Sequence, residues 1–179
     1  IVEGLLSMGV DPESLDAIFV THEHADHIQG IGVMSRKYHI PVFSTKGTIM
    51  EMLRNKNLGK VDSSLFHVVR PGEDLKIKNM TISPFSMPHD AADPVSYSVR
   101  DDHRKIGMVT DLGFYDQRIL EALSGSDLLY VEANHDLRML ETGPYPYDLK
   151  RRVAGNYGHL CNEMAGRMVG QSLNPKLQQ

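Results

Sequence analysis

The sequence predicts a layered α/β fold. Short blocks of β-forming residues alternate along the chain with segments in which apolar residues recur at helical spacing, and strands flanked by amphipathic helices pack as layers. No internal repeat, low-complexity tract or long linker divides the 179 residues, and this length is sufficient to bury a core. We therefore expect one domain over residues 1–179.

The first part of the chain is expected to hold two short strands among three helices. Gly9 is a plausible stop for the first helix, and the side-chain oxygen of Ser44 or Thr45 can cap the third. The segment "DPESL" reads as a turn ahead of the first strand. The expected helices cover residues 1–10, 27–38 and 49–56, and the expected strands cover 15–21 and 40–45.

The middle of the chain is rich in β-formers, and the alternation of helix and strand returns after it. "DDHR" reads as a hairpin turn between two of the middle strands. The β-forming stretches cover residues 66–69, 74–85, 95–100, 105–111 and 127–134, and the later helices cover 115–125, 149–154 and 162–169.

The composition limits the function classes. A net charge of −4 weighs against binding nucleic acid over the whole surface, because non-specific DNA binders neutralise phosphates and are usually basic. A nucleic-acid substrate would need a local basic groove or metal ions. The single cysteine, Cys161, fits a reducing compartment, so we expect a cytoplasmic protein. No apolar run approaches the roughly 18 residues that cross a bilayer, and we expect no membrane partner.

Four metal-ligand residues follow the expected strand 15–21 in the pattern H-x-H-x-D-H. His22 and His24 leave the strand at positions i and i+2, so their side chains point the same way and can converge on one ion. Asp26 and His27, after the chain turns, can face a second ion. Imidazole and carboxylate suit zinc, manganese or iron. A histidine-rich polar loop without metal is the alternative, and the dense spacing disfavours it.

Two later strand ends carry further candidates. His89 follows the β-forming stretch 74–85, and Asp111 ends the stretch 105–111 before a glycine turn. Each alone could be a capping or turn residue. Together with the cluster they predict a two-metal set, with His22, His24 and His89 on one ion, Asp26 and His27 on the other, and Asp111 bridging.

These motifs resemble those of the metallo-β-lactamase-fold hydrolases. The match is more specific to the YycJ/WalJ (VicX) branch, bacterial proteins related to the RNase Z and PhnP phosphodiesterases. The resemblance implies an αββα sandwich with the metals at one edge of its two sheets. It runs over nearly the whole chain and is carried by "THEHADHIQGIGVMSRKY", "PHDAADPVSYSV", "VTDLGF", "VEANHDLRML" and "YPYDLKRRVAGNYGHLCNE".

The resemblance also sets an expectation about the two ends. The family fold begins with strands ahead of its first helix and closes with a strand whose terminal histidine completes the second metal's shell. This sequence starts after the former and stops before the latter. We therefore expect a sandwich that lacks its first strands and its closing C-terminal strand, with a second metal site that is incomplete within this chain.

Further site residues are implied by the same comparison. His159 matches a histidine that protonates the leaving group in RNase Z-like relatives, and a helix-capping role is the alternative. Glu132 and His135 match a family motif and could orient ligands from behind them. Arg151 or Arg152 could hold a substrate phosphate, although a basic "LKRR" run is more often a solvated helix face.

The sequence thus favours a metal-dependent phosphodiesterase, and the resemblance implies DNA or RNA as its substrate, with exonuclease action from a 5′ end. Two ions, zinc or manganese, would activate a hydroxide that Asp26 orients, and His159 would protonate the departing oxygen. One alternative is a dinuclear hydrolase of a small ester, thioester or lactone, because the fold does not set the substrate. Another is a non-catalytic regulatory protein of a two-component system.

Overall fold

A computed structural model describes residues 1–172 of the chain. The chain separates into two compact units, and each is described by itself. The first unit comprises residues 1–71 and 91–95, and the second comprises residues 72–90 and those from 96 onward. The single domain expected over 1–179 stays a prediction.

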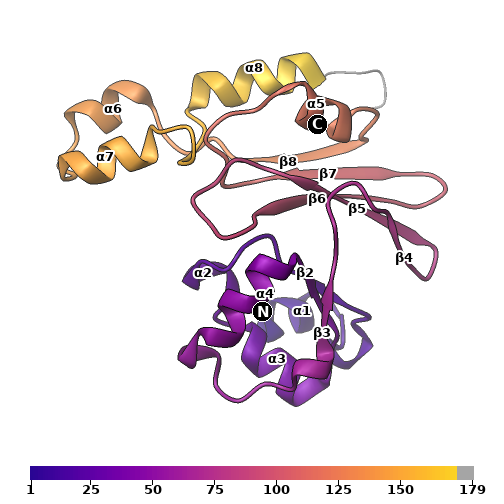
Figure 1. The fold of residues 1–179 in the computed structure, drawn as a ribbon. Coiled ribbons are helices and arrows are strands. Elements are labelled where there is room, and N and C mark those ends of the chain that lie inside the picture. Colours follow the sequence, from indigo (N-terminus) through magenta and orange to yellow (C-terminus); the bar gives the residue numbers. More distant parts are fainter. Residues whose placement is uncertain (173–179) are drawn as a thin grey trace. The chain divides into compact units, whose positions relative to one another are not determined.

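The first unit is built on a three-stranded parallel sheet in the order β1-β2-β3 (Figure 1). Its core packs apolar side chains of the strands against those of the helices, among them Val20, Ile28, Val42 and Met52. The strands are β1 (Ile18–Phe19), β2 (Val42–Ser44) and β3 (Phe66–Val68), and the helices are α1 (Val2–Ser7), α2 (Ala25–Ile28), α3 (Ile31–Tyr38) and α4 (Lys46–Arg54), with short 3₁₀ turns at Pro12–Ser14, Lys56–Leu58 and Ser63–Leu65.

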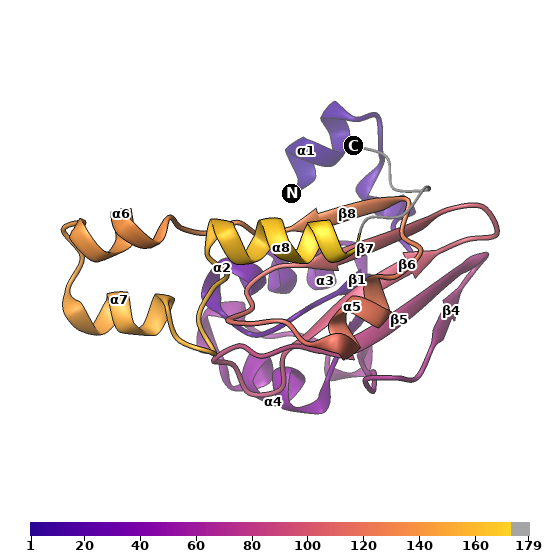
Figure 2. The same ribbon diagram turned by 90° about the horizontal axis from the view of Figure 1, so that it is seen from above.

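The second unit contains a five-stranded sheet in the order β4-β5-β6-β7-β8. The pairs β4–β5 and β6–β7 are antiparallel, whereas β7 and β8 are parallel. Figures 1 and 2 show α5 and α8 lying over one face of this sheet. The strands are β4 (Leu75–Ile77), β5 (Met80–Ser86), β6 (Val95–Arg100), β7 (Lys105–Val109) and β8 (Leu128–Val131), and the helices are α5 (Gln117–Leu123), α6 (Leu137–Thr142), α7 (Tyr147–Val153) and α8 (Asn162–Ser172).

The parallel pairing of β7 and β8 determines where the polar residues that follow these two strands lie. The crossover between the two strands contains α5, whose Ile119 and Leu123 pack with Val109 and with Met168 of α8. Because parallel strands end at the same edge of a sheet, the residues that follow β7 and β8 emerge side by side. Glu132 shows this directly, since its backbone N–H donates to the carbonyl of Val109 at 3.0 Å.

The element boundaries differ from the sequence prediction in places. The strand expected over 15–21 is limited to Ile18–Phe19, and the helix expected over 27–38 is divided into α2 and α3 around Gln29–Gly30. Thr45 is the cap of α4, accepting from the N–H of Thr48. The expected absence of a closing strand concerns residues 173–179, which lie outside the described part. Among residues 1–172, no helix has the length and apolarity to span a membrane.

Candidate metal centre

In the first unit, three imidazoles gather where β1 leads into α2, with His22 and His24 in the loop and His27 in the helix. The ring of His22 lies edge-on to His24 with centroids 4.6 Å apart, and its centroid is 4.1 Å from that of His27. Asp26 lies beside them, with a carboxylate oxygen 3.7 Å from His27 Nε2 and with 82% of its side chain exposed. The four residues of the H-x-H-x-D-H motif therefore form one local cluster of ligand-type side chains.

Glu23, the spacer inside this motif, holds the loop between β1 and α2 (the histidine loop) in place through hydrogen bonds. One of its carboxylate oxygens accepts the backbone N–H of Ala92 at 2.7 Å, and the other accepts the hydroxyl of Thr48 at 3.2 Å. The adjacent backbone is also held, because the N–H of Val95 donates to the carbonyl of Thr21 at 3.0 Å. These bonds tie the histidine loop to α4 and to the segment 91–95, and they limit its freedom to rearrange.

In the second unit, the residues that follow the parallel strands meet a loop that precedes α8. Asp111 follows β7, Glu132 follows β8, and His159 lies in the loop before α8. His159 Nδ1 is 3.0 Å from a carboxylate oxygen of Glu132 and 3.4 Å from one of Asp111. Asp111 has φ +57°, a left-handed conformation that aspartate tolerates better than most residues. The strand-end aspartate and the catalytic histidine of the prediction are thus brought together.

Glu132 organises this cluster of the second unit. Its Oε1 accepts the backbone N–H groups of Leu112 and Leu160, each at 2.9 Å, while Oε2 faces His159. Leu112 follows Asp111 and Leu160 follows His159, so one carboxylate holds the two loops that carry those side chains. The sequence prediction gave Glu132 only a supporting role behind the ligands, and that role stays a prediction.

The same contacts change the proton affinity of His159. The hydrogen bond to Glu132 raises the pKa of His159, the charge of Asp111 adds to this, and partial burial opposes it. An imidazole between two carboxylates keeps its proton to higher pH than a solvated one. His159 is therefore suited to donate a proton.

His89 is oriented by the backbone of the loop that carries His159. Its Nδ1 is 3.1 Å from the carbonyl oxygen of Gly158, and because a carbonyl only accepts, Nδ1 must hold the proton. Its Nε2 lies 3.4 Å from a carboxylate oxygen of Asp90. Metal-binding histidines commonly donate the other ring N–H to a backbone carbonyl, as Nδ1 does here. The rings of His89 and His159 lie edge to face with centroids 5.3 Å apart.

The two arginines expected as phosphate ligands have different surroundings. Arg152 forms a two-point ion pair with Asp90, with Nε and Nη2 at 2.5 and 3.1 Å from the carboxylate oxygens. The aspartate directly follows His89, so this pair ties α7 to the loop that carries His89. Arg151 is exposed and lies on the groove between α6 and α7. His135 pairs through its backbone with Cys161 and Asn162, and burial lowers its pKa.

Sequence reasoning missed two structural features near this site. Asp90 received no role, although a carboxylate next to a candidate ligand histidine was a visible signal. Helix α6 was not expected, although its N-cap was readable, since Asp136 Oδ1 accepts the N–H of Met139 at 2.8 Å.

The donor atoms in both units fit divalent metal ions. The first unit offers imidazoles and a carboxylate in one local cluster, drawn from the loop after β1 and from α2. In the second unit, single ligand atoms of Asp111, Glu132 and His159 all lie within 4.8 Å of one another. Nitrogen and carboxylate oxygen donors at such spacing suit zinc and manganese.

Comparison with known proteins agrees with this chemistry. The family model described as "Beta-lactamase superfamily domain" matches residues 6–170, and the chain belongs to this family. Membership of this family confirms the predicted metallo-β-lactamase fold. The family and the grouped histidine and acidic side chains imply divalent metal ions.

Particular relatives lie in the predicted branch. The chain is 40% identical over 152 residues to the exodeoxyribonuclease WalJ of Streptococcus pneumoniae, covering 85% of this chain and 56% of that protein. It is 36% identical over 153 residues to the exodeoxyribonuclease YycJ of Bacillus anthracis, covering 84% and 56% respectively. The chain thus spans about half the length of these relatives. The short form of human tRNase Z shares the fold, with a TM-score of 0.64 at 17% identity, covering 95% of this chain and 73% of that one.

Proposed function

We propose that this protein is a metal-dependent exonuclease that hydrolyses phosphodiester bonds of DNA. The observation that carries the proposal is the contact of His159 with Glu132 and Asp111. These contacts hold an imidazole that can donate a proton at the sheet edge where β7 and β8 end, in a chain of the β-lactamase superfamily. The names of the relatives from Streptococcus pneumoniae and Bacillus anthracis support DNA as the substrate.

The proposed cofactor is a pair of divalent ions, zinc or manganese. His22, His24 and His89 would hold one ion and Asp26 and His27 the other, with Asp111 serving both. When bound, such ions supply a nucleophile at neutral pH and neutralise charge on a phosphodiester. This assignment rests on the donor types, on the local clusters of each unit and on the family.

The side chains of the protein supply positioning and proton transfer. Glu132 holds His159 through Nδ1, which leaves Nε2 to protonate the departing oxygen. Asp26 is exposed beside the histidine cluster, where its carboxylate can orient the attacking water. A nuclease with this arrangement tolerates a net charge of −4, because the cations and a few local basic residues meet the substrate's charge.

The test is degradation of single-stranded DNA by protein expressed from the complete reading frame. A 5′-labelled oligonucleotide is incubated with chelator-treated enzyme, with or without added Mn²⁺ or Zn²⁺, and the products are resolved by length. Asp26→Ala should abolish metal-dependent release of nucleotides. Asp102→Ala changes an exposed acid in the β6–β7 turn and should behave as wild type.

Two results would overturn the proposal. The first is an inert wild type that still binds metal, which would direct attention to small esters or to a regulatory role. The second is equal activity in wild type and Asp26→Ala. Loss of activity in Asp26→Ala with retention in Asp102→Ala would support the proposed nuclease and the role of Asp26 together.

A further inference from the structure

The α6–α7 hairpin begins and ends at the proton-donor network. The chain leaves the sheet after Glu132 and returns at His159, and those two side chains are 3.0 Å apart. Backbone bonds close the base of this excursion, with Asn134 N–H donating to Leu160 and Asn162 N–H donating to His135. Figures 1 and 2 show the hairpin extending from the rest of the second unit.

The hairpin exposes several large apolar and aromatic side chains. Helix α7 has no buried residue, and α6 buries only Leu140. Tyr147 is 73% exposed, and the other exposed large apolar side chains of the excursion are Leu137, Met139, Tyr145, Leu149 and Tyr157. An exposed apolar surface of this kind indicates a site that a binding partner covers.

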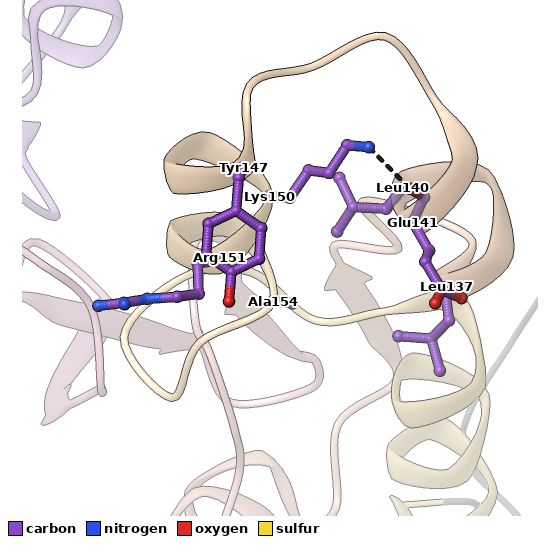
Figure 3. Close-up of a pocket in the computed structure, with 7 residues that line it drawn as sticks. All are labelled: Leu137, Leu140, Glu141, Tyr147, Lys150, Arg151 and Ala154. Atoms are coloured by element: carbon purple, nitrogen blue, oxygen red, sulfur yellow. Dashed lines mark hydrogen bonds between the residues drawn. The ribbon is translucent and has the colours of Figure 1, made fainter.

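A groove of about 330 Å³ lies between the two helices (Figure 3). Leu137, Leu140 and Ala154 line it with apolar atoms, and Tyr147 and Arg151 border it from α7. Tyr147 and Arg151 are four residues apart, so they share one face of the helix. Figure 3 shows Lys150 turned toward α6, where its Nζ donates to the carbonyl of Glu141 at 2.7 Å.

The charge of the hairpin is opposite to that of the chain. Residues 137–154 contain four cationic side chains and two anionic ones, whereas the whole chain carries −4. Arg152 is ion-paired with Asp90, and Arg151 and Arg138 are further exposed guanidinium groups of this segment. One acidic side chain, Glu141, lines the groove as well, so the basic character lies toward α7.

We propose that this groove binds single-stranded nucleic acid, with a base stacked on Tyr147 and the adjacent phosphate held by Arg151. Exposed aromatic rings alternating with cations are how proteins hold single strands without reading their sequence. An apolar protein surface would account for the exposed apolar side chains but not for the local positive charge. The proposal rests on the proposed nuclease function, and it adds a site that holds the substrate strand on the hairpin whose ends meet at the proton donor.

The test separates strand binding from hydrolysis. Binding of a short fluorescein-labelled oligothymidylate is followed by fluorescence anisotropy in excess chelator, so that the metal centre contributes nothing. Tyr147→Ala should weaken binding about tenfold or more, whereas Tyr147→Phe keeps the ring and should bind as wild type. Arg151→Ala should also lower the slope of log affinity against log salt by about 0.7, the loss of one phosphate contact.

A matched variant and a small substrate complete the design. Tyr130→Ala removes a tyrosine that is 65% exposed on β8, away from the groove, and should leave binding unchanged. With metal restored, Tyr147→Ala should raise KM for single-stranded DNA and leave hydrolysis of bis(p-nitrophenyl) phosphate unaltered.

The outcomes distinguish this inference from the nuclease proposal. If DNA is degraded but Tyr147→Ala binds and degrades it as wild type does, the groove proposal is wrong and the nuclease proposal stands. If the oligonucleotide binds in a Tyr147-dependent way but no metal supports hydrolysis, the nuclease proposal is wrong and the groove proposal stands. A dimer in sedimentation that Tyr147→Ala dissolves would assign the groove to a second copy of the chain and overturn the inference.

Discussion

Replacing Glu132 with alanine should destabilise the second unit by a calculable amount. Its Oε1 accepts two backbone N–H groups at 2.9 Å, and the side chain is only 11% exposed. A hydrogen bond to a charged group contributes about 1.5–3 kcal/mol, so loss of both is expected to cost about 3–6 kcal/mol. Glu132→Gln keeps an oxygen in place for both N–H groups, and its cost should be about half as large.

The measurement is urea unfolding in excess chelator, so that bound metal does not add to the stability of any of the three proteins. The midpoint should fall from wild type to Glu132→Gln and further to Glu132→Ala, with an unchanged dependence of the unfolding free energy on urea. Equal stability of the two variants would refute the reasoning, because the carboxylate would then contribute through something other than the two N–H acceptor bonds. A loss of less than about 1 kcal/mol in Glu132→Ala would refute it as well.

Three further predictions concern the pKa of His159, the packing at Gly158 and the removal of metal. In metal-free protein the pKa of His159 is higher in the folded state than in the unfolded state. Protonated His159 therefore stabilises the folded protein fully below the unfolded-state pKa, and this stabilisation is lost as pH rises through the folded-state pKa. The stability difference between wild type and Glu132→Gln should shrink over that rise, and NMR titration of the ring should show a lower pKa in the variant. Gly158→Ala should lower the melting temperature and the activity, because its Cβ would lie 2.1 Å from the carbonyl oxygen of Arg152. The control Gly166→Ala places a Cβ with nothing within 4 Å, and calorimetry should show it melting at or above the wild-type temperature. Removing metal with chelator should lower the melting temperature, and added Zn²⁺ or Mn²⁺ should restore it, unless the clusters bind no metal.

Local features of the site were readable from the sequence because short separations fix geometry. His22 and His24 are two residues apart behind a strand, and their rings are neighbours in the structure. Asp111 was readable as a strand-end residue, because an apolar run followed by a glycine turn marks the end of a buried strand. The layered α/β class followed from the same alternation of periodic segments.

The tertiary structure decided which partners the long-range groups take. Glu132 binds backbone groups 20 and 28 residues away, and Arg152 binds Asp90 across 62 residues. Periodicity cannot reveal such pairs, because they depend on how the loops after β7 and β8 and before α8 meet.

The same limit applies to the neighbouring arginines of α7. By sequence, Arg151 and Arg152 are equivalent members of one basic run. In the helix their side chains point about 100° apart, so Arg152 reaches the loop of His89 while Arg151 borders the groove. The sequence by itself determined which candidate ligand types are present and their local spacing. Only the tertiary structure assigned each charge to a role, because a side chain's partner depends on the packing of segments that are distant in the chain.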